Sequence, residues 1–448
     1  MLRKTTTKFG NLAGLPGNDP RVTVYKGIPF AMPPVGDLRW KAPVYGRTWE
    51  GTLDAVRFAP ISIQDQPGVG DDLYCLEWHV DPDIPMSEDC LYLNIWTPAK
   101  KEGEKLPVLV WFFGGAFQWG YTAEMEFNGE RLARRGIIVV SVNYRLGAFG
   151  FLAHKDLREE SPDAPGNFGL LDQKAGLRWV YENIQAFGGD PENITIAGQS
   201  AGGGSVLNQM CNKDNYPMLK GAVIFSGIIR FPDDAILTPS PIEKVEETGD
   251  EFLKFLGVSS IAEGRKLDAL FIRDKYAEFA AGHNRFVPCI DGVNFKGDAY
   301  DLFTAGDYAD IPVMTGYTKD EFTFSGTNMV RSSVYDAVGK VTNIAGRKNI
   351  YVYDFCPEIP GWDNPGVFHS SDLWFWFETL NMCWRDFSGK HFELARRMCD
   401  CFANFVKYHD PNGSSKAPDS NDSKNVPQDK IPWNAADSKN LNIYTLAL

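Results

Sequence analysis

Residues 198–202 read Gly-Gln-Ser-Ala-Gly and directly follow the short apolar run 194–196. The pattern G-x-S-x-G after a strand is typical of a sharp strand-to-helix turn, in which the serine hydroxyl projects above a sheet and can attack a carbonyl carbon. Glycine is needed beside the serine because neighbouring backbone comes too close for a side chain. Taken alone the pattern also fits an ordinary glycine-rich turn. Ser200 is therefore a candidate nucleophile that depends on partners elsewhere in the chain.

A nucleophilic serine needs a histidine base to accept its proton and a carboxylate to orient that base. In enzymes with such a turn, the carboxylate and then the histidine follow the serine in the chain. We predict His369 as the base, because it follows the apolar run 350–355 and a Pro/Gly-rich loop and can lie beyond the end of a strand. The other histidines after the serine lie at a possible helix end or in or beside a predicted helix; they are His283, His391 and His409.

Two acidic residues, Asp320 and Glu321, come just after the apolar run 312–314. Either could lie beyond the end of a strand and orient the base. Their position alone does not choose between them, and by itself it favours a solvated acidic loop.

A glycine-rich loop, Phe-Gly-Gly-Ala-Phe at 113–117, follows another apolar run at 107–112. Small residues let backbone N–H groups approach the oxygen that becomes negatively charged when the serine attacks. The N–H of Ala201, beside the nucleophile, would add a further donor.

Buried strands alternating with helices are the elements that must position these residues. Continuous apolar runs typical of strands covered on both faces occur at 107–112, 136–142, 194–196, 222–225, 312–314 and 350–353. Apolar residues at helical spacing predict helices over about 171–187 and 392–406. This alternation predicts an α/β fold with a large, mostly parallel sheet flanked by helices.

The chain has no internal repeat and no linker that clearly divides it, so we expect a single domain over residues 1–448. Residues 232–306 are rich in charged, helix-forming sequence and predict a helical insertion over the edge of the sheet. Residues 411–430 are polar, contain three prolines and predict an exposed loop.

The net charge of −13, with no long basic run, argues against nucleic acid as a partner. No apolar stretch is long enough to span a bilayer, and no secretory signal is visible at the N-terminus, so we expect a cytoplasmic protein, with a mature extracellular form as the alternative. Eight cysteines in 448 residues do not make a disulfide scaffold, and no His/Cys cluster has the spacing of a zinc site.

Several long motifs resemble those of the type-B carboxylesterase family, which has the α/β-hydrolase fold. They lie at residues 25–40 (YKGIPFAMPPVGDLRW), 88–95 (EDCLYLNI), 143–150 (NYRLGAFG), 166–173 (GNFGLLDQ) and 187–202 (FGGDPENITIAGQSAG). The resemblance is dense from about residue 10 to 227 and thinner from 311 to 377.

This resemblance implies an ester hydrolase that forms an acyl-serine, with no cofactor and no metal. It implies Ser200 as nucleophile, Glu321 as orienting acid and His369 as base. It further implies an oxyanion hole formed by Gly115, Ala116 and Ala201. Gly114, Phe113 and Gln199 are the expected substrate contacts.

Three departures from the family pattern bear on the substrate. Gln199 stands where the family usually has Glu, Phe113 where His or Tyr is common, and Ala116 where Gly is more usual. The missing carboxylate beside Ser200 predicts a small, uncharged, apolar ester. The family also often joins two cysteines that match Cys75 and Cys90, which predicts a disulfide there.

Two alternatives keep the fold but change the function. One is an acyltransferase or lactone-forming biosynthetic enzyme that uses the same acyl-serine. The other is a catalytically inactive adhesion or scaffold protein, which the presence of Ser200, Glu321 and His369 opposes.

Overall fold

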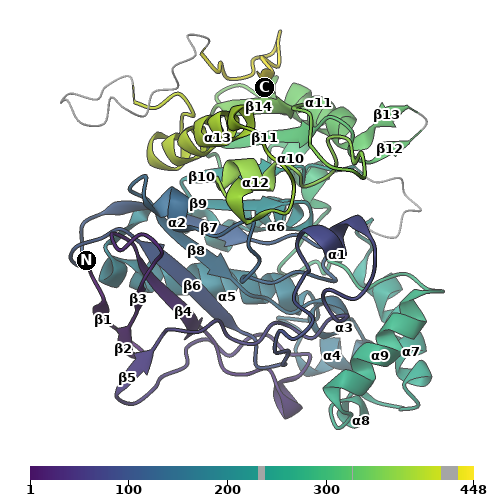
Figure 1. Ribbon diagram of the computed structural model, residues 1–448. Helices are drawn as coiled ribbons and strands as arrows, with labels where there is room; N and C mark the ends of the chain where they lie inside the picture. The colour runs from purple at the N-terminus through teal and green to yellow at the C-terminus, as the bar shows by residue number, and fades with distance from the viewer. Residues whose placement is uncertain (231–237, 325, 415–431) are drawn as a thin grey trace.

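A large twisted sheet forms the centre of the computed structural model, which describes residues 1–230, 238–324, 326–414 and 432–448 (Figure 1). Among these residues it has ten strands, in the order β15-β14-β11-β10-β9-β7-β8-β6-β4-β3. The strands from β15 to β8 are parallel, and β6, β4 and β3 continue the sheet in antiparallel fashion. In chain order their bounds are β3 (Leu15–Pro16), β4 (Thr23–Pro29), β6 (Tyr92–Thr97), β7 (Leu106–Phe112), β8 (Ile138–Val142), β9 (Gly189–Gln199), β10 (Gly221–Phe225), β11 (Val313–Thr318), β14 (Ile350–Phe355) and β15 (Tyr444–Leu446).

Smaller strands and the helices surround this sheet. A three-stranded sheet contains β1 (Lys4–Thr7), β2 (Gly10–Ala13) and β5 (Thr52–Asp54), and β12 (Thr323–Phe324) pairs with β13 (Thr327–Asn328). The α-helices are α1 (Leu73–Glu77), α2 (Glu130–Ala133), α3 (Gly147–Phe151), α4 (Lys155–Glu160), α5 (Phe168–Asn183), α6 (Ala201–Cys211), α7 (Ile242–Phe255), α8 (Ile261–Gly264), α9 (Ala269–Ala280), α10 (Ala299–Ala305), α11 (Met329–Thr342), α12 (Leu373–Trp376) and α13 (Gly389–Tyr408). Short 3-10 helices are η1 (Gly36–Leu38), η2 (Ile184–Phe187), η3 (Lys213–Met218) and η4 (Leu380–Met382).

Both faces of the sheet are covered, which explains why its strands are apolar without interruption. Along β7, Val108 and Val110 pack into the core formed with α5, α6 and α11, whereas Leu109 and Trp111 pack into the core formed with α12 and α13. Because successive strand residues point to opposite faces, each face of β7 needs its own apolar set.

The six strands predicted from apolar runs are all present, as β7, β8, β9, β10, β11 and β14. The two predicted helices correspond to α5, which continues into η2, and to α13. These confirm the predicted α/β architecture with a mostly parallel sheet.

The helical insertion is placed differently from the prediction. Helices α7 and α9 do not cover a sheet edge; Phe252 and Phe279 pack with Phe149 and Phe151 of α3 in a separate apolar core. Helix α10 instead packs against α6 and α11. Of the predicted loop 411–430, only residues 411–414 lie within the described part of the chain.

Two features of the described residues bear on partners. No helix there has both the length and the apolar character that crossing a bilayer requires. No three His, Cys, Asp or Glu side chains gather there in a way that would hold a metal ion.

Candidate active site

Ser200 lies on the sharp turn between β9 and α6 that its sequence predicts. Its backbone angles, φ 56° and ψ −124°, are rare for a residue with a side chain and are typical of strain kept at a functional position. Its N–H donates to the carbonyl of Phe225 on the neighbouring strand at 2.9 Å. A Cβ at Gly198 would lie 2.2 Å from the carbonyl oxygen of Gly202, so the turn requires glycine there.

His369 contacts Glu321 through Nδ1. The Glu321 carboxylate is 1% exposed and also accepts the N–H of Thr318 at 2.8 Å and the hydroxyl of Ser226 at 3.0 Å. These bonds fix the carboxylate, so it can hold the imidazole in one orientation with the proton on Nδ1. The opposite ring nitrogen, Nε2, is then the basic atom.

The structure shows which of the two adjacent acids, Asp320 or Glu321, bonds to the histidine. Asp320 turns away from the histidine and accepts the N–H of Val367 at 2.8 Å, while Glu321 bonds to His369. The remaining histidines have other partners. His283 bonds to the carbonyl of Phe279, His391 caps the start of α13 at Ser388, and His409 ends that helix.

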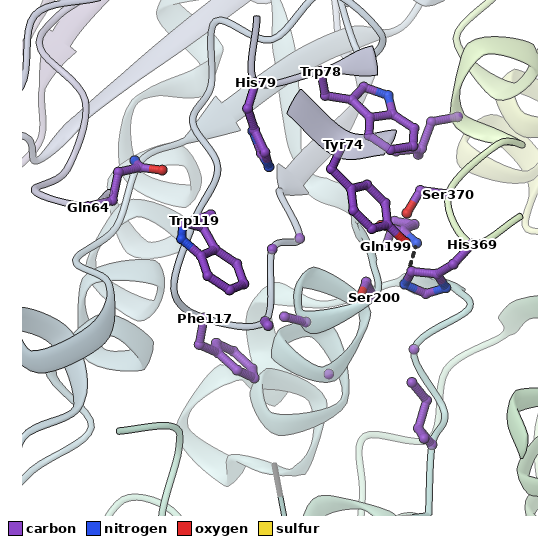
Figure 2. A pocket seen from close by; sticks show the side chains of 18 of the residues that line it. Gln64, Tyr74, Trp78, His79, Phe117, Trp119, Gln199, Ser200, His369 and Ser370 are labelled. Carbon is purple, nitrogen blue, oxygen red and sulfur yellow. Dashed lines mark hydrogen bonds between the residues drawn. The ribbon is translucent and has the colours of Figure 1, made fainter. Parts of the chain in front are cut away.

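The side chain of Gln199 lies against the base. Its amide nitrogen is 3.2 Å from Nε2 of His369, and both residues line the same cavity as Ser200 (Figure 2). The predicted contact residue is therefore placed at the site, where it bonds to the histidine.

The glycine-rich loop after β7 turns sharply beside the serine. Gly115 and Ala116 have φ of 102° and 54°, and a Cβ at Gly115 would lie 2.2 Å from the carbonyl oxygen of Trp119. Within the described residues, the N–H groups of Gly115 and Ala116 have no hydrogen-bond acceptor, and Ala201 is the first residue of α6, where an N–H has no acceptor inside the helix. All three residues line the cavity, which suits donors that wait for a substrate oxygen.

One expected substrate contact is wrong. The Phe113 side chain is fully buried and stacks on Tyr144, with ring centroids 4.3 Å apart, and it does not line the cavity. Its position at the end of β7 turns the ring into the core. Gly114 does line the cavity, and a Cβ there would lie 3.0 Å from Oε1 of Gln199.

The predicted disulfide is also absent. Cys75 and Cys90 are both free thiols. Cys75 Sγ lies in α1 near the carbonyl of Val69, whereas Cys90 Sγ is buried against the hydroxyl of Ser62, so the two thiols have different surroundings.

A cavity of about 680 Å³ opens above Ser200, large enough for a small organic substrate. Its aromatic wall has Tyr74 and Trp78 from α1 and its C-cap, and Phe117 and Trp119 from the loop after β7 (Figure 2). Residues 373–377, shortly after His369, read Leu-Trp-Phe-Trp-Phe. Of these, only Leu373 lines the cavity, and Trp374 and Trp376 are buried in the core.

Sequence reasoning missed a polar part of the cavity wall. His79 Nδ1 donates to Glu124 at 3.1 Å, and Glu126 lies nearby at 1% exposure. Although burial opposes it, the Glu124 carboxylate raises the pKa of His79. Burial and then Glu124 raise the pKa of Glu126 well above its usual range. His79 is far from Glu124 and Glu126 in the sequence, so no sequence pattern predicts that they meet.

The chain matches the carboxylesterase family over residues 3–336 and 325–448. It is 36% identical to a fumonisin B1 esterase of Sphingopyxis macrogoltabida (70% of this chain, 55% of the relative), 37% to a cholinesterase of Mus musculus (71% and 53%) and 38% to a para-nitrobenzyl esterase of Bacillus subtilis (70% and 62%). It therefore spans little more than half the length of these curated relatives.

Solved structures give a fuller match. A PNB esterase superposes with a TM-score of 0.82 at 28% identity, covering 100% of this chain and 96% of that one. A thermophilic PNB esterase superposes at 0.81 with 27% identity, covering 100% and 96%. The fold is thus the α/β-hydrolase fold that the motifs predict. From the family match across both parts of its length, this chain belongs to the carboxylesterase family.

Proposed function

We propose that the protein hydrolyses carboxylic esters through an acyl-serine formed on Ser200. The observation that carries the proposal is the position of His369 between the Glu321 carboxylate and the cavity that contains Ser200. His369 bonds through Nδ1 to the buried Glu321, its Nε2 lies 3.2 Å from the amide nitrogen of Gln199, and its side chain lines the same cavity as the strained Ser200. This leaves Nε2 as the atom that takes up a proton.

In the first half of the reaction, Ser200 Oγ bonds to the ester carbonyl carbon while its proton passes to His369 Nε2. The carbonyl oxygen becomes negative, and in this proposal the N–H groups of Gly115, Ala116 and Ala201 donate to it. The histidine then gives the proton to the departing alcohol oxygen as the C–O bond breaks.

In the second half, His369 removes a proton from water, and the hydroxide oxygen bonds to the acyl carbon. Breakdown of this intermediate releases the acid and returns the proton to Ser200. Glu321 stabilises the imidazolium through its bond to Nδ1. Hydrolysis is favoured over acyl transfer because the relatives and the solved neighbours named above are esterases.

For the substrate we propose a small, uncharged and largely apolar ester. Four acidic residues in the wall have partners: Asp72 and Asp298 cap helices, Asp65 accepts the Trp119 indole N–H, and Glu124 pairs with His79. The fifth, Glu126, has one oxygen without a partner, but burial and Glu124 raise the pKa of its carboxyl well above the usual range, which favours the neutral form. The residue beside the serine is a neutral amide. Such a wall offers aromatic surface without a free negative charge for a cationic group.

A series of p-nitrophenyl esters from acetyl to palmitoyl tests the proposal with wild type and Ser200→Ala. We expect wild type to cleave the short members and Ser200→Ala to lose at least about 10³-fold in kcat. Wild type that cleaves no member would refute ester hydrolysis. Equal cleavage by both proteins would refute Ser200 as the nucleophile.

A further inference from the structure

The hydrogen bond between Gln199 and His369 fixes which atoms carry protons. Two nitrogens face each other, Gln199 Nε2 and His369 Nε2, at 3.2 Å. An amide NH2 can only donate, so the histidine nitrogen must accept. The ring proton is then on Nδ1, where the Glu321 carboxylate accepts it.

This bond uses the same lone pair that has to accept the proton of Ser200. Gln199 is 3% exposed and His369 6% exposed, so water does not readily replace the amide. No hydrogen bond of Ser200 Oγ to the base is found within the described residues, although both side chains line the cavity. The amide also has a defined place, since Gly114 leaves room for its oxygen where a Cβ would lie 3.0 Å away.

We propose that Gln199 is a positioning residue that holds the Nε2 lone pair of His369 in the free protein and releases it to Ser200 when an ester occupies the cavity. The inference rests on the proposed function and deepens it. It assigns to the residue before the nucleophile a role in preparing the base, beyond contact with substrate.

The chemistry of proton transfer explains why an amide suits this position. When Ser200 Oγ bonds to the carbonyl carbon, its proton moves to Nε2, which becomes an N–H donor. A Gln199 amide that still presented its NH2 would then repel the imidazolium. With its NH2 toward Nε2, glutamine favours the neutral base that can accept the proton, whereas glutamate favours the imidazolium and methionine favours neither form.

Other titratable groups also lie near His369, and their effects on its titration must be distinguished from the effect of Gln199. Glu321 contacts the ring directly, and Asp372 at the start of α12 interacts with its charge. Tyr74 from α1 and Tyr353 from β14 are close enough to Glu321 to interact with its charge. Burial raises the pKa of Asp372 to about 6. Ionisation of this carboxyl can therefore also contribute to the acid limb, the part of a pH profile in which activity falls at low pH.

The test measures kcat/KM against pH for an uncharged p-nitrophenyl ester in wild type, Gln199→Met and Gln199→Glu. Methionine removes the bond to the neutral base, so the apparent pKa of the acid limb should rise by about 0.5. Glutamate stabilises the imidazolium, so this pKa should rise by about 1 to 2. Gln185→Glu, at an exposed position of η2, adds the same charge outside the cavity lining and should change the pKa of the acid limb by less than about 0.2 units.

A second measurement reads His369 itself and does not need activity. In protein labelled with ¹⁵N-histidine, the His369 ring signals, assigned with His369→Ala, report protonation and tautomer across the same pH range. We expect a neutral ring with its proton on Nδ1 in wild type, and a pKa of His369 that rises from wild type to Gln199→Met to Gln199→Glu. The same three proteins carrying Asp372→Asn should show the same ranking.

The outcomes separate this inference from the proposed function. If Ser200→Ala is inactive but both Gln199 variants titrate like wild type, the positioning role is wrong and the nucleophile stands. If Ser200→Ala keeps full activity, the proposed function fails, while the ring signals still decide whether Gln199 bonds to Nε2.

Discussion

Arg385 and Glu77 form an ion pair in which both side chains are completely buried. Glu77 ends α1, whose Tyr74 lines the cavity, and Arg385 lies in the segment that follows α12. The Trp374 indole N–H of α12 also donates to Glu77 at 3.2 Å. The pair therefore joins the aromatic wall to the chain segment that carries the base.

Removing one partner of this pair should destabilise the protein strongly, because the other charge stays buried without compensation. We expect Arg385→Met to lower the free energy of unfolding by about 3 to 5 kcal/mol, measured by urea denaturation. The exposed pair of Arg178 and Glu182 provides the control, and Arg178→Met should cost less than about 1 kcal/mol. Equal losses in the two variants would contradict a structural role for the buried pair.

Neutralising Glu321 should damage catalysis far more than neutralising its neighbour. In Glu321→Gln the amide no longer fixes the Nδ1–H tautomer of His369, so kcat should fall by about 10³ to 10⁴-fold. The control, Asp320→Asn, neutralises the neighbouring carboxylate, which accepts the Val367 N–H. It should change kcat by less than about fivefold. A larger loss in Asp320→Asn would reverse the assignment of the acid.

The strands and the acid illustrate what the sequence can and cannot predict. The run 107–112 identifies β7 because a strand covered on both faces must be apolar throughout. The choice of Glu321 over Asp320 depends on how one loop turns after β11, since the two acids are adjacent, and only the fold or the family pattern decides it.

Phe113 and the polar wall show the same limit. An aromatic residue before a glycine-rich loop can face either the cavity or the core, and stacking on Tyr144 places Phe113 in the core. Helix α1 is five residues long, too short for a helical period, so its contribution to the cavity has no sequence signal. His79 and Glu124 meet only through the folded chain.

Ala116 should limit the bulk of the alcohol group that the site accepts. Its φ of 54° is unfavourable for a residue with a side chain, and its methyl group lies at the proposed oxyanion hole. We expect Ala116→Gly to raise kcat/KM for tertiary-alcohol esters by about 10-fold or more relative to primary-alcohol esters. A uniform change for both ester types would show that the methyl group does not select the alcohol.

Asp372 should make the protein less stable as the pH rises. Burial raises the pKa of its carboxyl from 3.8 to about 6, so between these values the folded state holds a proton that the unfolded state has lost. Stability contributed by this proton is present below about pH 4 and is lost as the pH rises through about 6. Asp372→Asn removes this dependence, so its stability relative to wild type should increase by roughly 3 kcal/mol between pH 4 and pH 7.

Urea denaturation at several pH values measures this difference, and the amide can still accept from Tyr353, which donates to Asp372 at 2.7 Å. A stability difference that does not change with pH would mean that folding does not raise the pKa of Asp372.

Covalent trapping is the most direct test of Ser200 as the nucleophile. A fluorophosphonate that reacts with activated serines is incubated with wild type, Ser200→Ala and Glu321→Gln, and the labelled peptide is identified by mass spectrometry. We expect one label per chain on Ser200 in wild type, no label in Ser200→Ala and slowed labelling in Glu321→Gln. A label on another residue, or equal labelling of Ser200→Ala, would contradict the assignment of Ser200 as the nucleophile.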